Sequence, residues 1–310
     1  MVSVIIPNYN HAKYLEERID SVLNQSYKDF EVIVLDDYST DNSKEVINKY
    51  AGHPKVSHII LNEENSGSTF KQWHKGFELA KGEYIWIAES DDMAHPDFLK
   101  ILMGAIGDDK SVTLAASGIT LINEEGKIIG HTGISKSKKP RKYTSSEFIR
   151  ENMLLGNHLL NASSAIFRKD VLNKIPKDYT KLKSSGDYLF WLEIANMGNV
   201  IEMPAELDYF RRSTASVTPR LYASGHAFEE AKIIYKRLIE LGYIKGIYKK
   251  LVVAFRLNQI RTTDKFTDED VRKRCLQLWK VETNTPKLDY ALLLMCGAYR
   301  KLRRKIRNIL

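Results

Sequence analysis

The chain has 310 residues, of which 43% are apolar, and this is enough material for a sizeable hydrophobic core. Charged residues make up 28%, and the 16 tyrosines and 4 tryptophans exclude a largely disordered chain. The two cysteines, Cys275 and Cys296, form neither a disulfide framework nor a metal-binding pattern, which favours a reducing, cytoplasmic compartment.

The sequence predicts no segment that enters or crosses a membrane. It opens on an apolar run at residues 2–6 without a basic leader, so we expect no secretory signal. The longest apolar stretch, residues 291–299, is about half of the roughly 20 residues that span a bilayer. We therefore expect a cytoplasmic protein without a transmembrane helix.

The formal net charge of +8 is concentrated in two places. One is the C-terminal tail, whose basic residues are Arg300, Lys301, Arg303, Arg304, Lys305 and Arg307. The other is a predicted loop, whose basic residues are Lys136, Lys138, Lys139, Arg141 and Lys142. Either cluster suits an anionic lipid, a phosphorylated ligand or a nucleic acid.

The first ninety residues alternate strand and helix patterns. Four short β-branched runs predict strands, at residues 2–6, 31–35, 56–61 and 84–87. Three intervening segments space apolar residues three and four apart and predict helices, at residues 14–25, 43–50 and 70–80. Near-continuous apolar strands joined by helices predict an α/β fold with a Rossmann-like, mostly parallel sheet that has helices on both faces. Ligands of such sheets bind at the carboxyl ends of the strands.

After Asp92 the alternation ends and a mixed pattern follows. Helices are expected at residues 96–106, 144–153 and 187–197, and Thr144 with Glu147 has the spacing of a capping box. Apolar runs follow at residues 112–116 and 119–122, and further strands are expected at residues 163–167 and 207–211. Beyond residue 219 only helices are predicted, at residues 227–241, 247–260, 268–279 and 288–309. The chain thus divides into an α/β domain, residues 1–218, and a helical C-terminal region, residues 219–310.

Polar residues follow the first two predicted strands. The first strand runs into Pro7 and Tyr9, and the tyrosine ring could stack on a base, although a plain strand-to-helix turn is the better explanation of this segment alone. The second strand ends in Asp36 and Asp37, whose adjacent carboxylates repel each other, a placement typical of ligand binding. One of them could accept the imide N–H of a uracil-like base. Residues 42–45 have capping-box spacing and start the next helix.

The fourth strand ends in the acidic run Glu89-Ser90-Asp91-Asp92. Mg²⁺ and Mn²⁺ prefer oxygen ligands, and one or two protein carboxylates are enough when a diphosphate completes the shell. A solvated turn before the next helix explains the run about equally well when it stands alone. Asp187 begins a later helix, where a capping role is favoured over that of a general base.

These pieces, in this order, resemble the family-2 glycosyltransferases, an inverting family with the GT-A fold. The resemblance covers residues 1–218. The motifs on which it rests are VIIPNYN at residues 4–10, VLDDYSTD at residues 34–41, AKGEYI at residues 80–85 and ESDD at residues 89–92. Four linked blocks are far more specific than any one short motif.

The resemblance assigns roles to individual positions. It implies that Pro7, Tyr9 and Asp37 line the pocket for the nucleotide base. It implies that Asp91 and Asp92 contact the ribose and the metal-bridged diphosphate, without deciding which of the two ligates the metal.

The remaining assignments concern the acceptor and the phosphates. The resemblance places the catalytic base at Asp187. It also implies that Arg211, the first residue of a downstream segment at 211–217, reaches toward the phosphates, and Lys71 is a further candidate for this role.

The sequence departs from the family pattern at several positions. Glu89 stands where aspartate is more frequent, and Gly186 stands where an acid often precedes the base. Ser213 replaces a common histidine, so we expect no histidine ligand to the metal and expect arginine to neutralise phosphate instead. The segment 65–76 is about one residue longer than usual, lacks an Arg-Asn pair, and carries His74, which we interpret as a helix-face residue.

The resemblance implies a Mn²⁺- or Mg²⁺-dependent inverting glycosyltransferase. Its donor would be a nucleotide-diphospho-sugar, a UDP-sugar foremost, and its acceptor a hydroxyl of a glycan or lipid-linked saccharide in cell-surface polysaccharide synthesis. A sugar-phosphate nucleotidyltransferase is disfavoured because residues 7–11 contain no glycine for a phosphate loop. A catalytically inactive relative that binds nucleotide-sugar or a membrane surface is the alternative.

The tail at residues 300–310 does not favour nucleic acid, because it contains no aromatic residue. Its apolar residues fall on one helical face: Leu302, Ile306, Ile309 and Leu310. This pattern predicts a helix that lies on the inner membrane surface or on a partner, and a solvated end of the C-terminal bundle is about as well supported.

Overall fold

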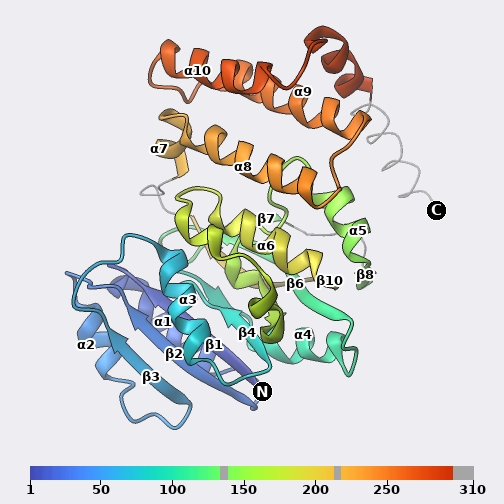
Figure 1. Ribbon diagram of the computed structural model, residues 1–310. Helices are drawn as coiled ribbons and strands as arrows, with labels where there is room; N and C mark the ends of the chain where they lie inside the picture. The colour runs from blue at the N-terminus through green and yellow to red at the C-terminus, as the bar shows by residue number, and fades with distance from the viewer. Residues whose placement is uncertain (133–138, 213–217, 296–310) are drawn as a thin grey trace. The chain divides into compact units, whose positions relative to one another are not determined.

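The computed structural model describes residues 1–132, 139–212 and 218–295 (Figure 1). The chain forms two compact units, one of residues 1–151 and 157–215 and the other of residues 152–156 and 216–310. The assignment of residues 1–218 as the catalytic domain stays a prediction. In the described part of the chain, the helices are all too short or too polar to cross a membrane.

The first unit is built on a sheet of ten strands among the described residues (Figure 1). They are β1 (Val2–Asn8), β2 (Phe30–Asp36), β3 (Val56–Leu61), β4 (Tyr84–Ile87), β5 (Met93–Ala94), β6 (Val112–Ile122), β7 (Ile128–Thr132), β8 (Arg141–Tyr143), β9 (Ala165–Arg168) and β10 (Asn199–Arg211). The order along the sheet is β3-β2-β1-β4-β9-β6-β10-β5, and β7 pairs with β6 and β8 with β10.

The direction of the strands changes after β4. β1 lies parallel to β2 and β4, and β2 lies parallel to β3, which confirms the predicted parallel arrangement of the first four strands. β9 is antiparallel to both β4 and β6, and β10 is parallel to β6. The whole sheet is therefore mixed, and the carboxyl ends of β1, β2 and β4 meet at one edge.

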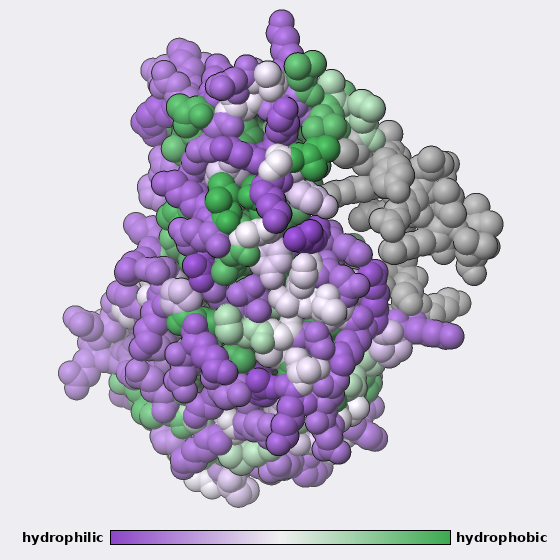
Figure 2. All heavy atoms as spheres, turned by 45° about the vertical axis from the view of Figure 1, so that its right-hand side comes forward, coloured by the Kyte–Doolittle hydropathy of each residue, from purple (hydrophilic) through white to green (hydrophobic). Residues whose placement is uncertain are grey.

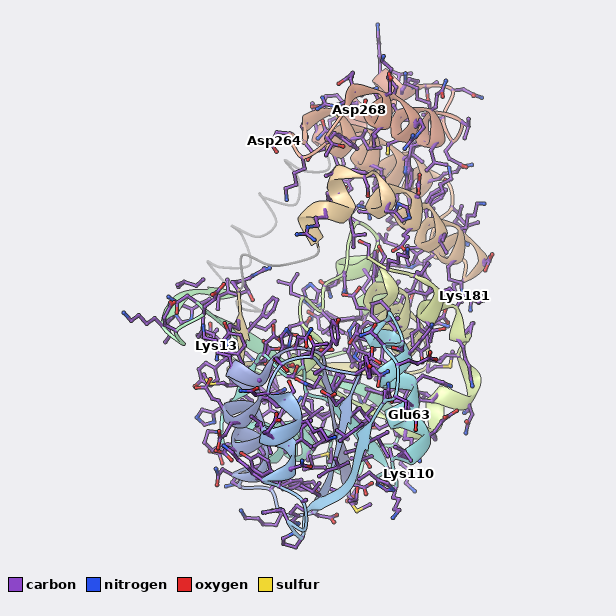
Figure 3. All side chains as sticks on the ribbon, turned by 90° about the vertical axis from the view of Figure 1, so that its left-hand side faces the viewer. Lys13, Glu63, Lys110, Lys181, Asp264 and Asp268 are labelled. Carbon is purple, nitrogen blue, oxygen red and sulfur yellow. The ribbon has the colours of Figure 1, made fainter. Side chains whose placement is uncertain are left out.

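Helices cover both faces of the sheet, as expected. Those of the first unit are α1 (Ala12–Leu23), α2 (Ser43–Asn48), α3 (Thr69–Leu79), α4 (Phe98–Ile106), α5 (Ser145–Phe148) and α6 (Gly186–Asn196). Alternate strand residues face opposite sides, so Val4 and Trp86 pack with the apolar sides of α1 and α4. On the other face Phe77 of α3 packs against Phe167 and Phe190. In Figure 3, Lys13 marks the first turn of α1 and Lys110 lies just before β6.

The two apolar runs at residues 112–116 and 119–122 belong to one strand, β6. Between the two runs lie Ser117 and Gly118, residue types that favour turns. Instead β10 adjusts to β6 with register shifts between Glu202 and Glu206, and Glu206 pairs opposite Gly118. Long-range pairing therefore overrides the local preference.

The two predicted capping boxes have different outcomes. Thr144 and Glu147 form theirs, with side chain and backbone bonded in both directions, and α5 continues into a π-helical turn at Ile149–Met153. Asn42 makes no side-chain cap. Asp41 replaces it, because its Oδ1 accepts from the Ser43 N–H at 3.0 Å and its Oδ2 from the Ala12 N–H at 2.8 Å.

The second unit is helical, as the sequence predicts. Its helices are α7 (Thr218–Ala223), α8 (His226–Glu240), α9 (Ile247–Thr262) and α10 (Glu269–Lys280). The indole of Trp279 is buried against Tyr235 and donates to the Phe228 carbonyl at 3.2 Å. Apolar residues such as Ile233 and Leu288 are exposed, and hydrophobic atoms lie among hydrophilic ones over this helical part in Figure 2.

Several predictions from the sequence concern residues that the structure does not describe. They are the basic amphipathic tail at 300–310, the final part of the helix expected at 288–309, Cys296, Ser213, and the part of the basic loop that contains Lys136 and Lys138. The helix itself is present over the described residues 286–295.

Gly82, in the turn between α3 and β4, leaves no space for a side chain. A Cβ there would lie 2.6 Å from the Ser3 backbone nitrogen and 2.9 Å from the Met1 carbonyl oxygen. We expect Gly82→Ala to lower the free energy of unfolding by about 1–3 kcal/mol, because overpacked backbone has to move. Gly104→Ala in α4 is the matched control, since a Cβ there meets open space. It should gain up to about 1 kcal/mol. Equal urea midpoints for the two variants would contradict this reading.

Candidate active site

Asp92 is the most deeply buried carboxylate of residues 89–92: 1% of its surface is exposed, and hydrogen bonds hold it in place. Its Oδ2 accepts hydrogen bonds from Asn161 Nδ2 and Ser163 Oγ, both at 2.7 Å. Its Oδ1 accepts from the Arg211 N–H at 3.0 Å. The side chain thus joins the end of β4 to the loop before β9 and to the end of β10.

Asp91 is placed differently from its neighbour. Its half-buried carboxylate accepts from its own backbone N–H, and within the described residues it has no other hydrogen-bond donor. The main chain beside it is fixed, because Arg211 Nε donates to the Asp91 carbonyl at 2.7 Å. Asp91 therefore offers a positioned carboxylate that is still available to a ligand.

Glu89 uses its longer side chain to reach helix α3. Trp73 Nε1 donates to Glu89 Oε1 at 2.8 Å, and the Glu89 N–H donates to Ser163 Oγ at 3.0 Å. Burial, with the neighbouring charge of Asp91, raises the pKa of Glu89 to about 8. Burial and the same charge raise the pKa of Asp92 to about 6. Burial thus makes negative charge costly along the run, and a cation at the half-buried carboxylate of Asp91 would offset this cost.

Asp208 and Arg18 belong to this cluster, and the sequence analysis missed both. Asp208 of β10 is completely buried, and its Oδ2 accepts from Asn161 Nδ2 at 2.9 Å. Burial raises the pKa of Asp208 well above its usual range. Arg18 lies on the buried face of α1 between Leu15 and Val22. The available signal was a charged residue within an apolar helix face or strand.

Asp37, at the end of β2, lies in a pocket of donors. Its Oδ1 accepts from Asn62 Nδ2 at 2.7 Å, from the Ser66 N–H at 2.9 Å and from Gln72 Nε2 at 2.8 Å. Its Oδ2 accepts from Ser66 Oγ at 2.8 Å. The Asp36 carboxylate instead accepts hydrogen bonds from Asn8 Nδ2 and from the Ser39 N–H. Separate sets of donors therefore relieve the repulsion between the two adjacent carboxylates.

Two exposed tyrosines lie beside this pocket in the chain. Pro7 is buried within β1, and Tyr9, which follows the strand, is 48% exposed. Tyr38 follows Asp37, is 52% exposed and has a positive φ of 65°. The loops that carry them are joined, because Asn10 Oδ1 accepts from the Thr40 N–H at 2.7 Å. Tyr38 is a second candidate for base stacking that the sequence analysis did not single out.

Asp187 lies in the first turn of α6, and the N-cap is Ser185. Asn157 Nδ2 donates to Asp187 Oδ2 at 2.8 Å. A Cβ on Gly186 would lie 2.4 Å from the ring of Phe70 in α3, so the close approach of the two helices explains why no acid precedes Asp187 here.

Helix α6 packs against the residue of α3 that binds Glu89. The ring of Trp73, which holds Glu89, is 5.6 Å from Phe190 and 6.5 Å from Trp191 of α6. These contacts bring the helix that carries Asp187 toward the end of β4.

The two candidate phosphate contacts already have partners. Lys71 is exposed, and its Nζ donates to the Ser66 carbonyl at 2.9 Å, beside the Asp37 pocket. Arg211 is buried: besides the Asp91 carbonyl it binds Glu17 Oε2 at 2.7 Å and stacks 4.4 Å from the Tyr14 ring centroid. In this structure Arg211 holds the acidic run in place through hydrogen bonds to Asp91 and Asp92. Its contact with phosphate stays a prediction.

The model of the family described as glycosyl transferase family 2 matches residues 3–175. The chain belongs to glycosyltransferase family 2. An uncharacterized glycosyltransferase of Methanocaldococcus jannaschii is 34% identical over 199 residues, 63% of this chain and 65% of that protein. The chondroitin synthase of Pasteurella multocida is 30% identical over 203 residues, 64% of this chain and 19% of that protein. The family-2 chain therefore spans less than two thirds of the length of either relative.

Solved structures confirm the expected GT-A type of fold for this family-2 chain. TarS 1–349 of S. aureus in complex with UDP-GlcNAc has a TM-score of 0.59 and 22% identity, covering 91% of this chain and 72% of that one. The mannosyltransferase PcManGT from Pyrobaculum calidifontis in complex with GDP-Man and Mn²⁺ has a TM-score of 0.53 and 18% identity, covering 99% and 82%. At these identities the likeness concerns the fold alone.

The acidic run of the family-2 chain suits a cation that the donor also binds. In the described ranges, no group of three or more His, Cys, Asp or Glu side chains is arranged to hold a metal ion by itself. Mg²⁺ and Mn²⁺ often take one or two protein carboxylates and complete their shell with phosphates and waters. The available carboxylate of Asp91, beside buried acids, fits that requirement, whereas Asp92 is 1% exposed and both of its oxygens already accept hydrogen bonds.

Proposed function

We propose that this chain is a metal-dependent, inverting glycosyltransferase that uses a nucleotide-diphospho-sugar as donor and a hydroxyl group as acceptor. The observation that carries the proposal is the available carboxylate of Asp91. It lies at the end of β4, on the sheet edge where β2 ends in the Asp37 pocket. Membership of family 2 supports the same reaction.

The base pocket consists of Asp37 with Pro7 and Tyr9. Three donors bind the Oδ1 oxygen of Asp37, whereas only one binds Oδ2. A lone pair of Oδ2 is therefore left for the N–H of a base. The uracil imide is a donor of this kind, and the exposed rings of Tyr9 and Tyr38 offer stacking surfaces. The UDP-GlcNAc complex of TarS supports a UDP-sugar, and the GDP-Man complex of PcManGT makes guanine the alternative base.

Asp91 would hold the metal ion together with the two phosphates of the donor. A bound Mn²⁺ or Mg²⁺ would supply positive charge where the departing diphosphate gains negative charge. Asp92 does not need to ligate it, because its role is to fix the run through Asn161 and Ser163. The Mn²⁺ in the PcManGT structure supports the use of a divalent ion.

Asp187 would act as the general base. Its carboxylate, oriented by Asn157, takes the proton of the acceptor hydroxyl as the oxygen attacks the anomeric carbon. The bond from that carbon to the diphosphate breaks, and the attack from the opposite face inverts its configuration. Lys71 can approach the donor from the Ser66 side, and Arg211 would reach a phosphate if it released one of its present partners.

The acceptor is proposed to be a glycan or a lipid-linked saccharide in cell-surface polysaccharide synthesis. The relationship to a chondroitin synthase supports a polysaccharide product. The proposed location is cytoplasmic, on the inner face of the membrane, through the tail at 300–310, which lies outside the described residues.

A donor screen tests the proposed function. Full-length protein is incubated with UDP-, GDP-, CMP- and dTDP-sugars, and the released nucleotide is measured with Mn²⁺ and with EDTA. We expect slow hydrolysis of a UDP-sugar that requires Mn²⁺ and stops with EDTA. A chain that neither binds nor hydrolyses any of the donors would support the inactive-relative alternative and refute the proposal.

A further inference from the structure

Arg18 is a charged residue in the middle of a buried helix face. Its side chain is 0% exposed, and α1 packs it into the core together with Leu15, Ile19 and Val22. The guanidinium carbon lies 4.9 Å from the ring centroid of Trp86 in β4. Arginine stays protonated under all ordinary conditions, so this position carries a permanent positive charge.

The guanidinium has no hydrogen bonds to compensate its burial. Its Nε, Nη1 and Nη2 all lack a partner within the part of the chain that the structure describes. Removing a charge from water without hydrogen bonds is costly, and stacking on Trp86 recovers only part of this cost. The remaining compensation has to come from opposite charge nearby.

The acidic run and β10 provide that charge. Asp92 and Asp208 are the strongest electrostatic partners of Arg18, followed by Glu89 and Asp91. Asp208 also lacks a hydrogen bond: its Oδ1 is buried and has no hydrogen-bond donor among the described residues. A buried cation and a buried acid, each with side-chain atoms that lack a hydrogen-bond partner, therefore interact electrostatically without a direct ion pair among the described residues.

We propose that Arg18 is a positioning residue for the metal-binding end of the site. Its fixed charge allows the carboxylates of Asp92 and Asp208, which share the Asn161 amide, to remain buried side by side. Arg18 is completely buried and would not touch the donor, so it would act through the charge that it offers to these acids. This inference rests on the proposed function, in which Asp91 holds the metal.

Asp91 depends on this arrangement through Arg211. The Arg211 N–H binds Asp92 Oδ1, and Arg211 Nε binds the Asp91 carbonyl. Loss of the Arg18 charge removes what compensates the burial of Asp92 and Asp208, so we expect Asp92 to shift and to move the main chain of Asp91 with it. The expected consequence is weaker metal binding, without loss of any direct ligand.

The test restores the charge balance with a second substitution. Arg18→Met keeps the bulk and the contact with Trp86 but removes the charge, and Asp208→Asn removes one of the buried acids that Arg18 compensates. We expect Arg18→Met to raise the Mn²⁺ concentration for half-maximal donor hydrolysis about 10- to 100-fold, as for other residues behind metal ligands. Arg18→Met combined with Asp208→Asn should return it to within about threefold of the parent, since coupled sites are not additive. Arg18→Lys, which keeps the charge, should also lie near the parent.

Two results would overturn the inference. One is an unchanged Mn²⁺ requirement in Arg18→Met, with only the midpoint of thermal unfolding lowered. The other is a double variant impaired as much as Arg18→Met. If the parent hydrolyses no donor, the proposed function fails, and the shift of the unfolding midpoint by Mn²⁺ with UDP becomes the readout. The same order of variants is then expected, and equal shifts in all of them would overturn the role of Arg18.

Discussion

Asp91→Asn is expected to lower kcat/KM for sugar transfer by about 10²–10³-fold while leaving the folded state intact. The substitution removes the available carboxylate that would meet the metal and the donor phosphates, an electrostatic contribution of this size in other enzymes. It leaves the hydrogen bonds of the run unchanged, because Arg211 binds the Asp91 carbonyl and not its side chain. Donor hydrolysis and transfer to acceptor should fall together.

Asp92→Asn is the matched comparison. The amide would place a donor among three donors, Asn161 Nδ2, Ser163 Oγ and the Arg211 N–H. Leaving buried groups unsatisfied costs about 1–3 kcal/mol, so this variant should lose both activity and unfolding free energy. Urea unfolding separates the two variants. Full activity in Asp91→Asn, or parental stability in Asp92→Asn, would contradict the division of roles.

Asp187→Asn has the second large expected effect, and it concerns the acceptor. A general base contributes about 10²–10⁴-fold, so kcat for transfer should fall within that range. Donor binding and the slow Mn²⁺-dependent hydrolysis should remain, because Asp187 does not hold the donor. Asparagine can still accept the Asn157 N–H, so the fold should be unaffected.

A surface carboxylate provides the control for Asp187. Asp178 forms an exposed ion pair with Lys181, and Asp178→Asn should leave transfer and hydrolysis unchanged. If Asp187→Asn lowered hydrolysis as much as transfer, its role would concern the donor, and the assignment as base would be wrong.

The first half of the sheet could be predicted because its signals are local. Residues 56–61 and 84–87 are predicted and observed with the same bounds, since short apolar runs mark both the partly buried edge strand β3 and the fully buried β4. The later strands depend on distant partners. β6 continues through Ser117 because β9 and β10 pair on both sides of it, and the three residues of β8 are ordered by β10.

The candidate site was likewise predictable only where its residues follow the parallel strands. Asp37, Asp91 and Asp92 were found because parallel strands bring their carboxyl ends to one edge. Asn161, Ser163 and Asp208 could not be found, because antiparallel β9 and a bent β10 carry them to that edge from far along the chain. The donors around Asp37 come from the loop after β3 and from α3, and no local pattern marks them.

Crystals of the full-length chain grown with Mn²⁺ and UDP provide the most direct measurement. Anomalous scattering from manganese should give a peak about 2.0–2.3 Å from a carboxylate oxygen of Asp91 and from the diphosphate, with the uracil near Asp37. A peak held by other residues, or UDP bound away from the ends of β1, β2 and β4, would contradict the proposed site.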